Sequence, residues 1–244
     1  MDKSVAIMQP YLFPYLGYFQ LIQHVDHFVF FDTAQYIRRG WINRNRILLD
    51  GQPYTFTLPV VKAPRDTTIA NMQIMDDPKS VNKLLQTIHR AYRDAPYFAE
   101  VYPLVEAVFL STEHNLCRRI VNHFQQITSY LDFNTTMTLA SEIETDTVEN
   151  AENRILAMCE TLDATTYINP WNGQHLYTAK KFLDRGIHLG FLEMQVEPYP
   201  QGDTDFVSHL SMLDVLMNCS VSEVHGLLSK YRILFVSELE QKNT

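Results

Sequence analysis

The sequence predicts an α/β fold with a mainly parallel sheet, and two observations carry this prediction. Residues 4–8 and 27–31 are short apolar runs with the length of buried strands, and residues 17–25 between them repeat apolar side chains with a helical period. A strand, a helix and a strand within about 30 residues form the βαβ unit, whose strands are parallel and whose crossover is right-handed. Later segments alternate in the same way, which extends the sheet.

The middle of the chain predicts a β-hairpin followed by helices. Residues 54–58 alternate polar and apolar side chains, and residues 69–75 carry a second apolar pattern. We expect these two segments to form an antiparallel pair. The period then becomes helical, which predicts a helical insertion, or a helical subdomain, at about 77–135 within a single α/β domain spanning 1–244.

The second half of the chain repeats strand and helix signals. In order, they predict a short β-like piece beginning at Leu139, a helix over 147–162, strands over 165–168 and 187–194, and helices over about 208–218 and 221–229. We expect these two strands to join the first two in parallel and residues 241–244 to form a frayed tail.

The charge and the cysteines bound the class of protein. Twenty basic and 28 acidic side chains give a net charge of −8, which lacks the broad positive field that general nucleic-acid binding requires. The three cysteines form no C-x-x-C pair and are typical of buried, reduced thiols. No run approaches the ~20 apolar residues of a membrane span, and the first apolar run is too short for a secretory signal. These features predict a soluble, cytoplasmic protein with no integral membrane segment.

The densest motif is Q-P-Y-L-F-P-Y-L-G-Y-F-Q at 9–20, where the first strand passes into the first helix. Ligands of open α/β sheets bind at this carboxyl edge. Prolines stiffen the loop, tyrosines offer flat faces with a hydroxyl tip, and a glycine permits close approach to the helix start. The candidate ring-binding residues are Gln9, Tyr11, Tyr15, Gly17 and Tyr18. The alternative is that the aromatic side chains only cover the sheet edge.

A second motif follows the second strand and holds four arginines within nine residues. Arginine forms a planar fork that matches phosphate or carboxylate, and aromatic neighbours stack on rings. The candidates are Gln35, Tyr36, Trp41, Asn43, Arg44, Asn45 and Arg46, with Asp32 at the strand end as the candidate catalytic base. The alternative is a solvated loop whose arginines pair with surface acids. RNA contact through this segment has no second basic surface to support it.

Two later segments are rich in amides and aromatic side chains, which suit sugar hydroxyls and rings. The first, at 167–177, contributes the candidates Asn169, Trp171, Asn172 and His175, although its Asn-Gly pair equally predicts a turn. The second, at 197–214, contributes Tyr199, Gln201, His209 and Asp214, although a helix cap by Asp205 or Ser208 is the simpler interpretation. If their strands join the sheet in parallel, we expect all four segments to meet at one crevice.

Several motifs are missing from the sequence. It contains no G-x-x-x-x-G-K-[ST], G-x-G-x-x-G, G-x-S-x-G or H-E-x-x-H, and its nine histidines are scattered, so we expect no metal site. No nucleophile stands out, which favours chemistry by positioning and charge stabilisation.

The chain resembles the WbqC-like family, which is named for a protein encoded in bacterial O-antigen gene clusters. The resemblance rests on I-M-Q-P-Y-L-F-P-Y-L-G-Y-F-Q-L-I at 7–22, F-V-F-F-D-T-A-Q-Y at 28–36, G-W-I-N-R-N-R-I at 40–47, A-P-Y-F at 95–98 and L-S-M-L-D-V-L-M-N at 210–218. It implies a role in making surface polysaccharides that contain N-acylated amino sugars.

The first βα unit also resembles the Rossmann-like, HUP-type folds that transfer adenylyl and nucleotidyl groups. Their His-x-Gly-His motif would fall on Tyr15-Leu16-Gly17-Tyr18, where only the glycine matches. Tyrosine cannot donate to phosphate as a cation, so Arg44 and Arg46 would have to supply that charge.

Taken together, residues and resemblance lead to a hypothesis for the function. It is an enzyme that attaches an acyl or aminoacyl group to the amine of a nucleotide-linked sugar. The donor is either an adenylate made from ATP or a thioester on a carrier protein. The rival from another class is a non-catalytic protein that binds the sugar nucleotide or helps assembly in the same pathway. A glycosyltransferase is a second rival, suggested by the D-x-D spacing of Asp203 and Asp205.

Overall fold

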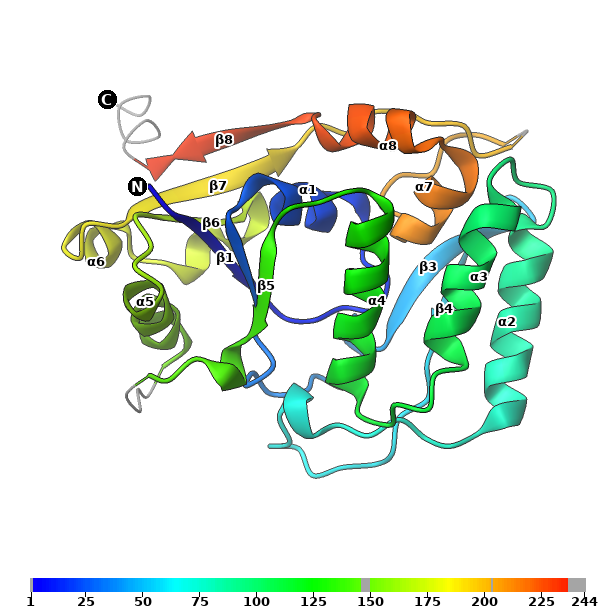
Figure 1. Cartoon of the computed structure of the whole chain (residues 1–244), viewed down its shortest axis with the longest axis horizontal. Helices are drawn as coiled ribbons and strands as arrows, with labels where there is room; N and C mark the ends of the chain where they lie inside the picture. Colours follow the sequence, from blue (N-terminus) through cyan, green and yellow to red (C-terminus); the bar gives the residue numbers. More distant parts are fainter. Residues whose placement is uncertain (1, 146–149, 203, 237–244) are drawn as a thin grey trace.

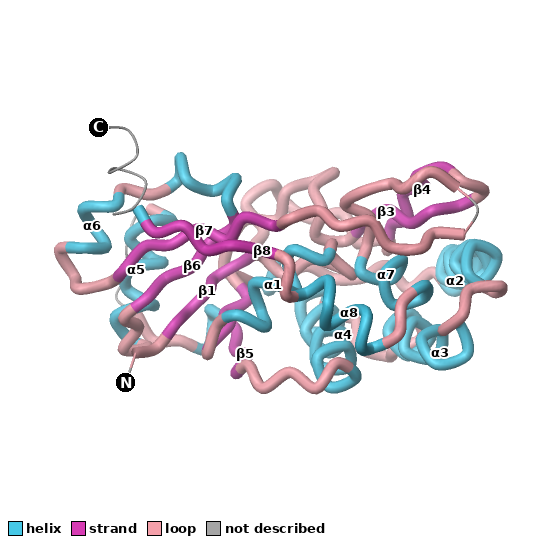
Figure 2. Tube along the Cα trace, turned by 90° about the horizontal axis from the view of Figure 1, so that it is seen from above, coloured by secondary structure: helices cyan, strands magenta, loops and turns pink. Residues whose placement is uncertain are grey.

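The computed structural model describes residues 2–145, 150–202 and 204–236. A six-stranded sheet in the order β5-β2-β1-β6-β7-β8 lies at one end of an elongated molecule (Figures 1 and 2). Its strands are β1 (Ser4–Met8), β2 (His27–Phe30), β5 (Thr136–Leu139), β6 (Thr166–Pro170), β7 (His188–Met194) and β8 (Tyr231–Phe235). The first five are parallel, and β8 pairs with β7 in the antiparallel sense. This arrangement confirms the predicted α/β fold with a mainly parallel, Rossmann-like sheet.

Helices cover both faces of the sheet and continue beyond it to the other end of the molecule (Figure 1). The helices are α1 (Leu16–His24), α2 (Pro78–Tyr92), α3 (Phe98–Phe109), α4 (Leu116–Tyr130), α5 (Ala151–Thr161), α6 (Ala179–Leu183), α7 (Met212–Asn218) and α8 (Val221–Leu228), with short 3₁₀ segments η1 (Ile69–Asn71), η2 (Ala140–Glu142) and η3 (Trp171–Leu176). Right-handed crossovers place α1 and α4 on one face and α5 and α6 on the other, because the connections run toward opposite edges.

A two-stranded hairpin lies at the other end of the molecule, beside α2 and α3 (Figures 1 and 2). It consists of β3 (Arg44–Leu49) and β4 (Gln52–Thr57), and its turn residues Asp50 and Gly51 both have positive φ. The predicted pairing of 54–58 with 69–75 is therefore wrong. The Asp-Gly dipeptide is a strong hairpin signal, and it joins β4 to the arginine-rich segment before it.

One apolar core joins the sheet to the helical segment between β4 and β5. Phe124 of α4 lies 5.3 Å from Tyr18 and 5.0 Å from Phe30, measured between ring centroids. Phe109 of α3 in turn packs on Phe13, with centroids 5.8 Å apart. Because buried side chains continue without a break from β1 to α3, the 9–16 segment is held from both ends of the molecule.

Other expectations differ in detail from the structure. The strand β8 and the short helix α6 were not predicted, and the C-terminal helix pair begins at Met212 rather than near 208. Ser211 caps α7 by accepting a hydrogen bond from the Leu213 amide, so neither Asp205 nor Ser208 is the cap. The predicted helix start at 147–149 and the tail at 241–244 lie outside the described residues. Within the described part of the chain, no helix has the length and hydrophobicity to cross a membrane.

Candidate functional site

The carboxyl edge of the sheet contains a topological switch point. From β1, the chain continues to β2 on one side, whereas β6 lies on the other side of β1. Ligands of open α/β sheets bind in the crevice at such a point, because the loops after the two central strands turn away from each other. The residues that follow or end the strands here are Gln9 after β1, Asp32 after β2, Ser141 after β5 and Asn169 in β6.

Asn169 is the centre of a polar cluster at the end of β6. It is 4% exposed, and its Nδ2 donates to the hydroxyl oxygens of Tyr167 at 2.9 Å and Tyr177 at 3.0 Å. The two hydroxyls also hydrogen-bond each other at 2.9 Å. A Cβ at Gly173 would overlap the Asn169 Oδ1 atom, so glycine permits η3 to fold back over the amide. The cluster fixes the Asn169 amide at the end of β6.

Asp32 is bound to the neighbouring strand end rather than left free. Its Oδ1 accepts from the backbone amide of Ser141 at 2.9 Å, and its Oδ2 accepts from the Ser141 hydroxyl at 2.6 Å. Asp32 is 1% exposed, whereas Ser141 is exposed. Any ligand amine would therefore meet the Ser141 hydroxyl before it met the Asp32 carboxylate.

Phe13 anchors the aromatic loop to three other segments. Its φ is +44°, a region that side chains other than glycine rarely adopt. Its amide donates to His123 Nε2 at 3.2 Å, while its carbonyl accepts from Asn45 Nδ2 at 2.8 Å and from the Ser211 hydroxyl at 2.7 Å. Burial lowers the pKa of His123 to about 3, so its neutral ring accepts this bond. Together these hydrogen bonds hold the Phe13 backbone in its strained conformation.

The tyrosines of the loop differ in their exposure. Tyr18 is 1% exposed and its hydroxyl donates to the Gln9 carbonyl at 2.6 Å, so it belongs to the core. The Tyr11 hydroxyl donates to Gln9 Oε1 at 3.3 Å, and burial raises the pKa of both Tyr11 and Tyr15. Gly17 is buried where a Cβ would lie 2.5 Å from Tyr15 Cε2. Tyr11, Tyr15 and Gln9 are half-buried and are the members of this motif that face partly outward.

The two arginines of β3 have different surroundings. Arg44 donates through Nε to the Gly40 carbonyl at 2.9 Å and through a terminal nitrogen to the Arg39 carbonyl, so it supports its own loop. Among the described residues, the Arg46 side chain makes one long hydrogen bond, 3.4 Å to the His209 carbonyl, and its buried Nε has no partner. Both guanidinium carbons lie near the Trp41 ring, at 5.4 and 5.8 Å from its centroid. Arg46 has the greater capacity to accept a ligand anion.

The other polar side chains of the arginine motif bind within the protein. The Tyr36 hydroxyl donates to Asn43 Oδ1 at 2.8 Å, and Asn43 Nδ2 donates to the Leu58 carbonyl at 2.7 Å. Gln35 donates to the Arg65 carbonyl. These bonds fold the 32–43 segment against β4 and the residues that follow it.

Asp214 is the acceptor of a buried network at the start of α7. It is 0% exposed and accepts from the hydroxyls of Tyr92 at 2.7 Å and Tyr199 at 2.8 Å and from Gln201 Nε2 at 2.9 Å. Burial raises the pKa of Asp214. A cavity of about 440 Å³ lies beside this network and is lined in part by Leu48, Tyr92, Gln201 and Asp214. The network ties the irregular segment after β7 to α2 and α7.

That irregular segment reaches the aromatic loop and β3 at its far end. Ser211 forms an antiparallel bridge with Tyr15, and its amide donates to the Arg46 carbonyl at 2.8 Å. The His209 ring lies 6.0 Å from the Tyr15 ring, and His209 has φ of +59°. Residues from the first, second and fourth sequence motifs thus lie side by side.

The remaining candidates make fewer contacts. Trp171 is half-buried in η3, and Asn172 and His175 are exposed. Of the D-x-D pair, Asp205 is exposed and Asp203 lies outside the described residues. Among the residues that the structure describes, no three His, Cys, Asp or Glu side chains converge in a way that would hold a metal ion.

The sequence analysis missed Ser141 and Arg154 at the carboxyl edge. Gln174 and Tyr177 lie within the 167–177 segment that it singled out, but they were not among its candidate site residues. Within the described part of the chain, Arg154 and Gln174 each have a buried side-chain nitrogen without a hydrogen-bond partner. A signal for Arg154 exists in the sequence, since Asn150 is a typical N-cap and a cation in the following turn opposes the usual charge preference of a helix start.

The fold and the site define an α/β protein with a Rossmann-like sheet whose carboxyl edge carries amides, tyrosines and arginines. A profile of the WbqC-like protein family matches residues 9–226, and the chain belongs to this family. It is 28% identical over 221 residues to the uncharacterized protein Rv1507c of Mycobacterium tuberculosis (strain ATCC 25618 / H37Rv). The aligned region covers 88% of this chain and 94% of that protein. No solved structure matches the chain.

Proposed function

We propose that this protein is a cytoplasmic enzyme of bacterial surface-polysaccharide biosynthesis that attaches an acyl or aminoacyl group to the amine of a nucleotide-linked amino sugar. The observation that supports this most is the switch point, where the ends of β1 and β6 bring Gln9 and Asn169 to one edge. Amide side chains at such an edge suit sugar and ribose hydroxyls. Family membership supports the pathway, because the family is named for an O-antigen cluster.

Arg46 is the proposed phosphate-binding residue for the nucleotide. Its Nε is buried without a partner, it lies over Trp41, and its strand is hydrogen-bonded to the segment that ends at Ser211. A diphosphate accepts the planar fork of arginine in two parallel hydrogen bonds. Tyr11 and Tyr15 would then provide the adjacent ring surface. We propose that Asn172 and His175 contact the sugar from the far half of the chain, whereas the Tyr199 hydroxyl is already donated to Asp214.

The positions that match the histidine motif of the HUP-type folds do not fit a triphosphate. Tyr18 is 1% exposed, and its hydroxyl donates to the Gln9 carbonyl. Tyr15 carries no charge, and burial raises its pKa further. We therefore route no step through ATP and favour a carrier thioester as the donor.

In the proposed reaction, Asp32 is the base and Ser141 passes the proton to it. The sugar ammonium gives one proton through the Ser141 hydroxyl to Asp32. Its nitrogen then forms the C–N bond with the thioester carbonyl, the C–S bond breaks, and the second N–H proton ends on the departing thiolate. The 2.6 Å bond between the Ser141 hydroxyl and Asp32 Oδ2 has the length of a charge-assisted hydrogen bond.

A non-catalytic sugar-nucleotide-binding protein is the second candidate. The observation that favours it is the burial of Asp32, whose two oxygens are already occupied by Ser141. In this candidate, the role of Asp32 is structural: its carboxylate joins the ends of β2 and β5.

Two measurements separate the candidates. A thermal-shift screen against nucleotides and nucleotide sugars identifies the acceptor, because a ligand at 100 times its Kd stabilises the folded state by about 2.7 kcal/mol. Mass spectrometry then follows N-acylation of that acceptor by a thioester donor. We expect product with the parent chain and at least a hundredfold slower formation with Asp32→Asn and Ser141→Ala. Binding without product from any thioester or adenylate would favour the second candidate, and no nucleotide-sugar binding would contradict both.

A further inference from the structure

Arg154 lies at the carboxyl edge of the sheet and has no role in the reaction as described. We propose that Arg154 binds the phosphate of a second ligand, the acyl donor, beside the ends of β2 and β5. This inference rests on the proposed function for the identity of the ligand and on the surroundings of Arg154 for the site itself.

The first argument is the state of the Arg154 side chain. Arg154 is half-buried, and its Nε is buried with no hydrogen-bond partner among the residues that the structure describes. Its guanidinium carbon lies 5.4 Å from the centroid of the Phe31 ring. Contact with the ring restricts the orientation of the guanidinium plane, while the nitrogens at its edge remain able to donate. An arginine that is held in place but has an unsatisfied donor is suited to bind an anion.

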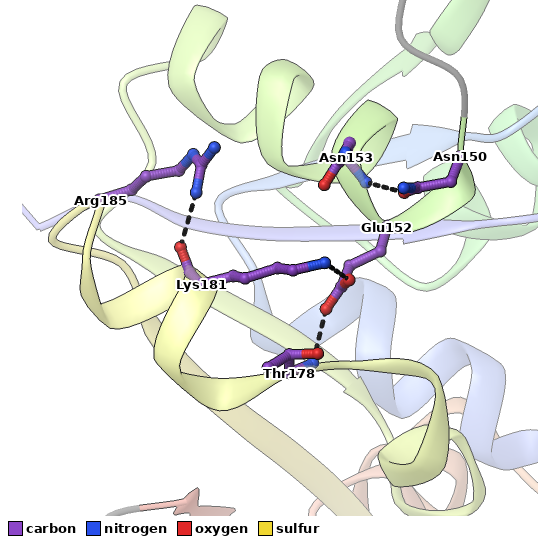
Figure 3. A network of polar contacts seen from close by, with 6 residues as sticks. All are labelled: Asn150, Glu152, Asn153, Thr178, Lys181 and Arg185. Atoms are coloured by element: carbon purple, nitrogen blue, oxygen red, sulfur yellow. Dashed lines mark hydrogen bonds and ion pairs between the residues drawn. The ribbon is translucent and has the colours of Figure 1, made fainter.

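The second argument concerns Glu152, the carboxylate closest to Arg154 in the described part of the sequence. Glu152 is already paired with another cation. Glu152 accepts from Lys181 Nζ at 2.5 Å and from the Thr178 amide at 2.5 Å (Figure 3). Residues two apart on an α-helix point about 200° apart, so Glu152 and Arg154 lie on opposite sides of α5. Lys181 and Arg185 have carboxylate partners, Glu152 and Glu160, whereas Arg154 has no ion pair among the described residues.

The third argument is the position of Arg154 relative to the proposed chemistry. Phe31 directly precedes Asp32, so the ring under Arg154 and the proposed base are consecutive residues. Arg154 also lies in the first turns of α5, where the positive end of the helix dipole disfavours a cation and favours an anion. A bound phosphate would satisfy both the guanidinium and this end of the helix.

The donor is the ligand that fits this position. An adenylate carries a phosphate in its AMP part, and a carrier thioester carries one in its prosthetic arm, so both donor forms supply the same anion. Arg46 then serves the phosphates of the acceptor and Arg154 the phosphate of the donor, which brings the two substrates to one edge from different sides.

The test is isothermal titration calorimetry with AMP and inorganic pyrophosphate as probes, and with adenosine as the uncharged comparison. The variants are Arg154→Gln, Arg154→Lys and the matched control Arg185→Gln, which removes an arginine on the same face of the sheet that is paired with Glu160. We expect Arg154→Gln to weaken AMP binding about tenfold or more, Arg154→Lys to weaken it less, and Arg185→Gln to bind like the parent. Adenosine should bind no more tightly to the parent than to Arg154→Gln.

Two results would overturn the site. One is that Arg154→Gln binds AMP and pyrophosphate as tightly as the parent does, when circular dichroism shows that both chains are folded. The other is no binding of either probe to the parent at about 10 mM. The proposed function fails separately: if Arg154 binds AMP and no acyl group is transferred to any amino sugar, the anion site stands and the reaction does not. Arg46→Gln should lose nucleotide-sugar affinity and keep AMP affinity, which separates the two arginines.

Discussion

Two polar regions border the carboxyl edge of the sheet, and they differ in how far the protein satisfies its own hydrogen bonds. In the aromatic loop, the Phe13 amide and carbonyl bind His123, Asn45 and Ser211, and the Tyr18 hydroxyl binds Gln9. In the second region, which draws on β3, α5 and η3, the buried nitrogens Arg46 Nε, Arg154 Nε and Gln174 Nε2 have no hydrogen-bond partner among the described residues.

The difference teaches where ligand capacity lies in this molecule. Unsatisfied buried donors are costly, so each one in a native structure calls for an explanation, and a bound ligand is the one that we infer for Arg46 and Arg154. The 9–20 motif has the most conspicuous sequence, yet its polar groups mostly hold other elements in place, and its buried side-chain atom without a partner among the described residues is an acceptor, Gln20 Oε1. The three unpartnered nitrogens come from β3, α5 and η3, which are less conspicuous in the sequence.

The largest expected effect concerns Asp214, which anchors the segment after β7. Asp214→Ala leaves the hydroxyls of Tyr92 and Tyr199 and the amide of Gln201 without their acceptor inside the core. We expect a loss of about 3 to 5 kcal/mol in the free energy of unfolding. For a chain of this length, the loss corresponds to a fall of Tm by about 10 °C, measured by circular dichroism.

The matched control is Tyr199→Phe, which removes one donor and leaves the carboxylate with two. It should cost about 1 kcal/mol. If Asp214→Ala left Tm unchanged and abolished nucleotide-sugar binding, Asp214 would be a ligand-binding residue and not a structural anchor.

The next effect is the pH dependence that His123 imposes on the anchored loop. Burial lowers its pKa from 6.5 to about 3, so below pH 6.5 the unfolded chain binds a proton that the folded chain does not. The stability from neutral His123 is complete above pH 6.5 and falls with pH toward 3. At pH 4.5 the loss is about 3 kcal/mol.

Urea unfolding from pH 7 to 4.5 measures this loss against His123→Gln, which can still accept from the Phe13 amide but does not titrate. Asp214 contributes in the opposite direction, since burial raises its pKa, so the difference between the two chains isolates His123. Equal pH slopes for parent and variant would mean that His123 titrates freely and that the loop is held less firmly than we infer.

Much of the fold was predictable from local patterns. Length and composition indicate buried parallel strands at four places, namely 4–8, 27–31, near 165 and near 187. The strand β3 was not predicted, because its Arg-Asn-Arg start is typical of a loop and its pairing depends on Asp50 and Gly51. The strand β8 was not predicted either, because it is a half-buried edge strand and tertiary packing determines which strand it pairs with.

The site was predictable in its location but less so in its members. A switch point follows from strand order, and motifs after strands indicate the residues near it. The sequence cannot tell which polar side chains are already satisfied. Asn43 and Asn45 have similar surroundings in the sequence to Arg46, yet both are used by backbone carbonyls. Such competition is decided by contacts between residues far apart in the chain.

A smaller effect is expected at Gly173, which is buried in η3 against Asn169. Gly173→Ala places a Cβ on the Asn169 Oδ1 atom, so either η3 or the amide must move. We expect about 2 kcal/mol of destabilisation from overpacking and a weakened nucleotide-sugar affinity, because Asn169 leaves its tyrosine partners. Gly226→Ala is the control, since a Cβ there meets nothing within 4 Å. Equal Tm for Gly173→Ala and the control would show that this turn yields without strain.

The smallest effect compares the two arginines of β3 directly. Arg46→Lys keeps the charge but loses the planar fork, so nucleotide-sugar binding should weaken about tenfold, or about 1.4 kcal/mol. Arg44→Lys should bind nearly as the parent does, because the Arg44 side chain is already used by the Gly40 and Arg39 carbonyls, and its loss should lower Tm slightly instead. Calorimetry with the best nucleotide sugar from the screen gives both affinities. If Arg44→Lys loses affinity and Arg46→Lys does not, an unpartnered donor is not what marks a ligand site in this protein, and the inference drawn from Arg154 weakens with it.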